Sequence, residues 1–217
     1  MTSEHKPSGR GPGRPRRLAD PVGTIQDVAR AHFALHGFER ASMADIAAEV
    51  GVRKPSLYAH FESKDALYLS IVPIAIEREL QTARRSFTAE GDLRDHLRDY
   101  LAGLRLRFEQ TDDMRFWLRA AFLPPEHLYD KVMEPIHAFM AQMEAMLVEA
   151  FSRHPVYGPL DAETLASAFL GLVDGLQVEL LYGGVAKFER RLHAFWRLFD
   201  LAVRPVGAPA SHEASLS

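Results

Sequence analysis

Apolar residues recur at spacings of three and four along almost the whole chain between its two polar ends. This spacing is the period of amphipathic helices, whereas strands would show strict alternation between turn residues. No convincing alternating run of that kind occurs in the sequence. The pattern therefore predicts an all-α protein of nine helices, three short ones followed by six longer ones.

The first predicted helices are separated by short turns. One helix begins with Thr24 as a possible cap and stops at Gly37, and the next is capped by Ser42 and ends at Gly51. A serine hydroxyl can accept a hydrogen bond from a first-turn N–H, and glycine can take the left-handed conformation that ends a helix. A helix pair with a glycine-containing turn, preceded by a supporting helix, is the arrangement that places a recognition helix in the major groove of DNA.

The helix predicted over residues 54–61 is the candidate reader of DNA. Pro55 lies in its first turn, where a missing N–H costs nothing. If Leu57 and Phe61 point into the core, the polar residues around them project outward and suit guanine edges or phosphate oxygens. Ser42 and Lys64 lie at helix N-termini, where backbone N–H groups favour an anion. The candidate contacts in this region are Ser42, Arg53, Lys54, Pro55, Ser56, Tyr58, His60 and Lys64.

The pattern by itself leaves an alternative open, because helix pairs with a glycine turn also occur in proteins that bind no DNA. The run SMADIAAEVGVRKPSLYAHFESKDAL, residues 42–67, resembles the DNA-binding motif of the TetR family of bacterial regulators. The resemblance rests on the Gly51-Val52 turn, the Leu57-Tyr58 pair, Phe61, and Lys64 with Leu67.

The resemblance implies a ligand-responsive regulator, usually a repressor, that binds a near-palindromic operator as a homodimer. It also implies phosphate contacts from Ser42, Tyr58 and Lys64, and base contacts from the start of the recognition helix. Arg53 stands where the family often has a small capping residue, so the recognition helix is expected to lack a good side-chain cap.

Charge is segregated along the chain. The whole chain has 26 Lys and Arg against 29 Asp and Glu, a net charge of −3. Residues 1–64 carry ten basic and seven acidic residues, which gives +3, and residues 65–217 carry sixteen and twenty-two, which gives −6. A basic segment for DNA binding, followed by an acidic remainder of the chain, fits a DNA-binding protein whose acidic part limits non-specific binding to DNA.

The basic residues at the start of the chain form a second candidate DNA contact. Gly13-Arg14-Pro15, with Arg16 and Arg17 after it, looks like the core of an AT-hook, which inserts arginine into a narrow minor groove. The alternative is a solvated basic tail. The predicted organisation is a disordered arm over residues 1–20, a DNA-binding domain over 21–66, a ligand-binding and dimerisation domain over 67–203, and a disordered tail over 204–217.

The last two predicted helices are apolar around much of their circumference, so they must be buried on two sides. Gly171 and Gly175, four residues apart, would let another helix come close. A four-helix interface between two subunits is the economical arrangement. The candidate interface residues are Gly171, Gly175, Leu192, Phe195 and Phe199.

The middle helices are rich in methionine and aromatic residues. Each such residue is more often plain core, but together they suit a cavity for a small apolar or aromatic effector. Asp174, Gln177 and Glu179 could orient it, and the long helix that begins at Lys64 would connect the cavity with the reader. The candidate ligand-binding residues are Phe108, Trp117, Phe122, Phe139, Met143, Phe169, Val173 and Gln177.

Other chemistries find little support in the sequence. The chain has no cysteine, so it has no disulfide or thiolate metal site, and a reducing cytoplasm fits. His32 and His36 could share a metal ion, but they lack a third ligand and both are expected to pack in the core. No catalytic motif, cofactor motif or membrane-spanning segment is recognised. The alternative from another class is a helical ligand-binding or interaction protein that does not regulate DNA.

Overall fold

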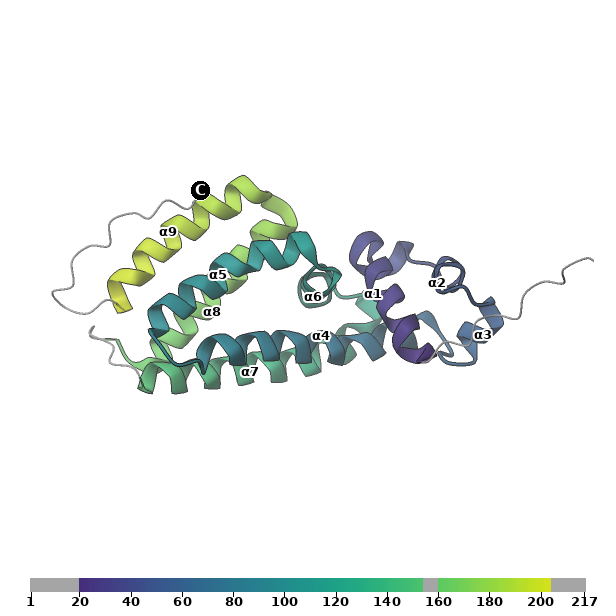
Figure 1. Ribbon diagram of the computed structural model, residues 1–217, viewed down its shortest axis with the longest axis horizontal. Helices are drawn as coiled ribbons and strands as arrows, with labels where there is room; N and C mark the ends of the chain where they lie inside the picture. The colour runs from purple at the N-terminus through teal and green to yellow at the C-terminus, as the bar shows by residue number, and fades with distance from the viewer. Residues whose placement is uncertain (1–19, 154–159, 204–217) are drawn as a thin grey trace, which may run out of the picture.

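The computed structural model describes residues 20–153 and 160–203. Every regular element in this part of the chain is helical, which confirms the all-α prediction (Figure 1). The α-helices are α1 (Pro21–Arg40), α2 (Met43–Val50), α3 (Lys54–Tyr58), α4 (Lys64–Phe87), α5 (Leu93–Gln110), α6 (Asp112–Phe122), α7 (Tyr129–Arg153), α8 (Ala162–Val178) and α9 (Val185–Val203). A 3₁₀ turn, Glu126–Leu128, precedes α7, and a π-helical segment, Glu179–Gly183, follows α8.

The first helix starts earlier than its sequence pattern predicted. Asp20, and not Thr24, is its cap, because the Asp20 carboxylate accepts a hydrogen bond from the Gly23 N–H at 3.0 Å. The helix has 20 residues, so it is not short, but its regular geometry is broken at Gly37, where φ is +74°. The helix was predicted to end at Gly37. Instead it kinks there and continues to Arg40.

The two helices of the DNA-binding motif follow the local signals closely. The Ser42 hydroxyl accepts from the Ala44 N–H at 3.1 Å, and Gly51 ends α2 with φ +78°. Arg53 makes no side-chain cap, as expected. The α3 helix covers Lys54–Tyr58, so it is shorter than the predicted 54–61 span.

Helix α4 joins the two ends of the elongated molecule. It starts beside α1 and α3, capped by the Ser63 hydroxyl, and runs into the body alongside α7 (Figure 1). At its start the rings of Phe33, Tyr68 and Phe116 meet, with centroids 5.1 Å apart for Phe33–Tyr68 and 5.3 Å for Tyr68–Phe116. These rings come from α1, α4 and α6, so one continuous core crosses the predicted domain boundary.

Helix α8 is the most apolar element of the body. Together with its π-helical extension (Ala162–Gly183), it is the one segment among the described residues that is long and apolar enough to cross a membrane by length and composition alone. It packs against α5, α7 and α9, and Leu165, Phe169 and Leu176 on it are fully buried. Its apolar side chains therefore pack in the core formed by these helices.

Candidate DNA interface and effector cavity

The recognition helix α3 is anchored by two residues and presents the others to solvent. Leu57 is fully buried, and Phe61, which follows the helix, is 8% exposed. Tyr58 is 40% exposed, and the Lys54 ammonium lies 5.8 Å from its ring centroid. The predicted DNA contacts that are exposed on or beside α3 are Arg53, Lys54, Pro55, Ser56, Tyr58 and His60.

Two further predicted phosphate contacts, Ser42 and Lys64, lie at the N-termini of α2 and α4. The Lys64 side chain is turned toward the end of α1, where its Nζ donates to the carbonyl oxygens of Phe38 at 2.8 Å and Ala41 at 3.3 Å. This ammonium stabilises the α1–α4 junction, so the position has a structural role that the sequence pattern did not indicate. The phosphate contact of Lys64 stays a prediction. The predicted arm residues Arg14, Arg16 and Arg17 lie outside the described residues.

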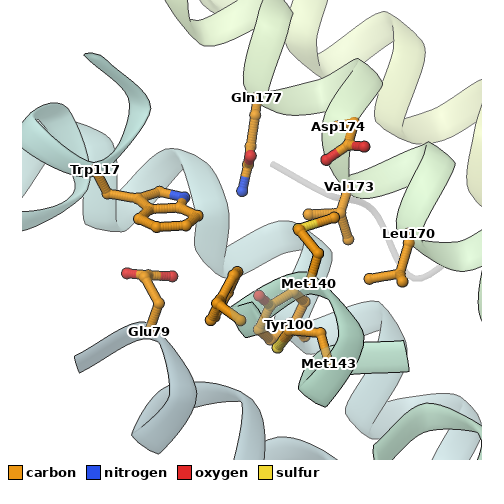
Figure 2. A pocket seen from close by; sticks show the side chains of 10 residues that line it. Glu79, Tyr100, Trp117, Met140, Met143, Leu170, Val173, Asp174 and Gln177 are labelled. Atoms are coloured by element: carbon orange, nitrogen blue, oxygen red, sulfur yellow. The ribbon is translucent and has the colours of Figure 1, made fainter. Parts of the chain in front are cut away.

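A cavity lies among helices α4, α5, α6, α7 and α8 in the body. It is narrow, with room for little more than one water molecule, so it is far smaller than the usual small-molecule pocket and a ligand would have to widen it. Five of the predicted ligand-binding residues line it: Trp117, Phe139, Met143, Val173 and Gln177. Asp174, predicted as a polar orienting group, lines it as well, and Figure 2 shows Trp117, Met143, Val173, Asp174 and Gln177 around the common space.

Three predicted ligand-binding aromatics do not line this cavity. Phe169 is fully buried, and its ring packs against the rings of Tyr100 and Phe199. Phe108 and Phe122 are partly buried against the core elsewhere. The Glu179 carboxylate is also absent from the lining, because it pairs with Arg191 at 2.9 Å.

Glu79 and Tyr100 line the cavity and were missed by sequence reasoning. Glu79 lies on α4 among the charged residues Glu77, Arg78 and Arg84, so its sequence context looks like a solvent-exposed face. In the structure it is 5% exposed. The one sign in the sequence is that Glu79 occupies a position where the helical period predicts a buried residue.

The cavity contains carboxylates in a poorly solvated place. Burial raises the pKa of Glu79, although Arg107, whose guanidinium lies 3.5 Å from the Glu79 carboxylate, acts in the opposite direction. Burial also raises the pKa of Asp174, and no charged partner offsets it. Gln177 beside them is 5% exposed. The cavity is therefore apolar in its walls and acidic at two points.

A network of charged side chains connects the cavity helices with α1. Asp113 of α6 pairs with Arg30 of α1 at 2.6 Å and with Arg78 of α4, and Arg30 also pairs with Asp27 at 2.8 Å. On the same helix α6, Arg119 donates from Nε to the Ala34 carbonyl oxygen of α1 at 2.7 Å. Helix α6 thus holds the kinked end and the middle of α1.

The predicted dimer residues divide into two groups. Leu192 and Phe199 are 4% and 6% exposed, so they are covered within the subunit, and their place at a dimer interface stays a prediction. Phe195 is partly buried, and a Cβ added at Gly175 would lie 3.2 Å from its ring. Gly171 faces open space. Side chains on α9 and on the π-helical segment after α8 that the sequence did not single out are also exposed: Tyr182, Leu198 and Leu201, each 66–70% exposed.

The two histidines of α1 differ in their surroundings. His32 is mostly buried, and its Nε2 lies 2.7 Å from the Glu49 carboxylate of α2. His36 is exposed, so the expectation that both histidines pack in the core is wrong for His36. Within the described ranges, no cluster of three or more His, Asp or Glu side chains could hold a metal ion.

Comparison with known proteins identifies the N-terminal motif. Residues 25–71 match the family model described as "Bacterial regulatory proteins, tetR family". The nucleoid occlusion factor SlmA of Vibrio atlanticus (strain LGP32) is 23% identical over 187 residues, which cover 83% of this chain and 93% of the relative.

Solved structures show the same fold over most of the chain. A TetR transcriptional regulator from Chloroflexus aurantiacus J-10-FL has a TM-score of 0.67 at 20% identity, with 85% of this chain and 96% of that chain covered. The structure described as AibR in complex with isovaleryl coenzyme A and operator DNA has a TM-score of 0.60 at 20% identity, with 86% and 100% covered. At these identities the likeness concerns the fold.

Proposed function

We propose that this chain is a transcriptional repressor of the TetR family, whose model matches residues 25–71, and that a small effector releases it from its operator. One observation carries the proposal: a short helix is anchored by buried Leu57 and presents polar residues to solvent on the surrounding positions. A helix presented in this way can enter a major groove while its fixed core contacts maintain its angle.

In the proposed complex, Lys54 and Arg53 read base edges or phosphates, and Ser42, Ser56, Tyr58 and His60 donate to phosphate oxygens. The α3 helix is too short to reach more than one groove, so a near-palindromic operator requires two copies. The exposed apolar face of α8 and α9, with Gly171, Leu198 and Leu201, supports a homodimer through these helices.

The arm before α1 adds affinity in this proposal, through Arg14, Arg16 and Arg17 in the adjacent minor groove. Each phosphate contact that the arm makes contributes to the salt dependence of binding. Deleting residues 1–17 is therefore expected to weaken operator binding and to flatten its salt dependence. An unchanged salt slope would remove the arm from the proposal.

Effector binding is proposed to act through helices α4 and α6. Trp117 in the cavity wall lies one turn after Asp113, which holds Arg30 of α1, and Glu79 in the wall directly follows Arg78 of the same charged network. A ligand larger than the present cavity must spread these helices. That movement would favour a state in which the two recognition helices no longer match successive grooves.

The proposed function requires DNA binding in the cytoplasm and involves no enzymatic step and no cofactor. The test is selection of bound genomic fragments by the purified full-length protein, followed by titration of the selected duplex with single variants. Lys54→Ala and Tyr58→Ala are expected to weaken binding, while Arg85→Ala, an exposed site at the far end of α4, leaves it unchanged (Figure 1). If the protein selects no sequence, or if all three variants bind equally, it is not an operator-binding regulator.

A further inference from the structure

The walls of the cavity combine aromatic rings with carboxylates, which is unusual for an apolar pocket. Trp117 and Phe139 form an aromatic corner, with ring centroids 4.7 Å apart in a T-shaped arrangement. Glu79 and Asp174 lie on different sides of the same space, on helices α4 and α8 (Figure 2). Aromatic faces and carboxylates both attract positive charge.

Negative charge exceeds positive charge around this space. Glu79 has one cationic partner, Arg107 of α5, at 3.5 Å. Asp174 forms no hydrogen bond or ion pair with any residue that the structure describes. Two carboxylates therefore line the cavity, one of them paired with a guanidinium, and the carboxylate without such a partner is half-buried. Burying a charge without a partner is costly, so such a group at a cavity is a candidate for binding a ligand.

A second, independent group points into the cavity from α8. Gln177 is 5% exposed, and its amide forms no hydrogen bond to the residues described here. Figure 2 shows the amide directed from α8 toward the space between Trp117 and Met140. A buried amide requires a hydrogen-bond partner, so a fully apolar ligand would leave it unsatisfied.

From this arrangement we propose that the effector is an amphipathic cation, an aromatic or branched apolar body that carries one ammonium group. The inference rests on the proposed function only in taking this cavity as the effector site. The ammonium pairs with Asp174 and faces the ring of Trp117. The apolar body lies against Met140, Met143 and Leu170, whose unbranched or flexible chains adapt to its shape.

Other ligand charges fit this cavity less well. A carboxylate or phosphate would lie near Glu79 and Asp174, and Arg107 could offer it only the buried Nε, because its Nη2 pairs with Glu79. A neutral apolar ligand would keep Asp174 desolvated and without a partner, which is unfavourable for the complex. A cation with a single charge matches the excess of one carboxylate.

The test is direct binding of three probes of matched shape to the full-length protein in the absence of DNA. The probes are benzyltrimethylammonium, its uncharged carbon isostere neopentylbenzene, and the anion phenylacetate. Calorimetry and the fluorescence of Trp117 report binding, with Trp196 as a constant background. The cation is expected to bind about tenfold more tightly than the isostere, and phenylacetate is expected to bind most weakly.

Two variants locate the charge recognition. Asp174→Asn keeps the shape of the side chain and is expected to weaken binding of the cation about tenfold while the isostere is unaffected. Glu163→Gln, an exposed site on the same helix, is the matched control and leaves all three affinities unchanged. The proposal is overturned if the cation fails to bind, if it binds no better than the isostere or phenylacetate, or if Asp174→Asn binds it as well as the wild type does.

These outcomes are separate from those of the proposed function, because the probes are measured without DNA. A protein that selects an operator but prefers phenylacetate would remain a regulator with an anionic effector. A protein that binds the cation through Asp174 but selects no DNA sequence would keep the cation site and lose the regulatory role.

Discussion

Replacing Lys64 with methionine tests the role that the structure gives to this side chain. Methionine keeps the length and apolar character of the stem and removes the ammonium. The Lys64 Nζ donates to the carbonyl oxygen of Phe38 at 2.8 Å and reaches those of Ala41 and Glu39 at 3.3 and 3.4 Å. It also lies 4.2 Å from the ring centroid of Phe38. These contacts fix the start of α4 against the end of α1.

The expected loss can be worked out from these contacts. A hydrogen bond with a charged donor contributes about 1.5–3 kcal/mol, and an exposed cation–π contact about 0.5–1 kcal/mol. Two of the three hydrogen bonds are long and the side chain is partly exposed, so only the Phe38 bond is counted in full. Lys64→Met is therefore expected to lower the free energy of unfolding by about 2–3 kcal/mol.

The assay is urea unfolding followed by far-ultraviolet circular dichroism, with a lower midpoint and an unchanged slope as the expected result. The matched control is Lys54→Met, whose ammonium projects from α3 near the Tyr58 ring only. This control is expected to change stability by less than about 0.5 kcal/mol while weakening operator binding. The reasoning fails if Lys64→Met is as stable as the wild type, or if both variants lose stability equally.

Three further predictions follow from the charged and capping residues. Burial raises the pKa of Asp174 in the folded state. The group therefore favours the folded state below its ordinary pKa of about 3.9, and this contribution to stability is lost as pH rises through the pKa that the group has in the folded state. Urea titrations of Asp174→Asn should therefore show a gain in stability at neutral pH that disappears in acid, and a gain that is equal at every pH would contradict the cause. Asp113→Asn removes the carboxylate that joins Arg30 and Arg78, and it should reduce the effect of an effector on operator affinity in fluorescence anisotropy more than it changes effector affinity. Ser42→Ala should lower the free energy of unfolding by about 1 kcal/mol through loss of the α2 cap, and an unchanged urea midpoint would show that the cap is dispensable.

The local features of this protein are determined by its sequence because their causes lie within a few residues. Ser42, Ser63 and Asp161 accept hydrogen bonds from N–H groups two or three residues ahead, and Gly51 takes the left-handed conformation that ends α2. The helical period of apolar residues likewise predicts the all-α class. Leu57 is buried, so the polar side chains of α3 face outward. The same helical period predicts which side of α3 is buried.

Tertiary structure alone decided which partner each side chain meets. The period marks Leu192 and Phe199 as buried, but it does not say whether a second subunit or the same subunit covers them, and here it is the same subunit. Lys64 and Glu79 lie in charged stretches that look solvent-exposed, yet one is held by carbonyl groups from α1 and the other lines a cavity with Arg107 of α5. These partners are 23 or more residues away along the chain, so their positions depend on how helices pack together, which no local pattern encodes.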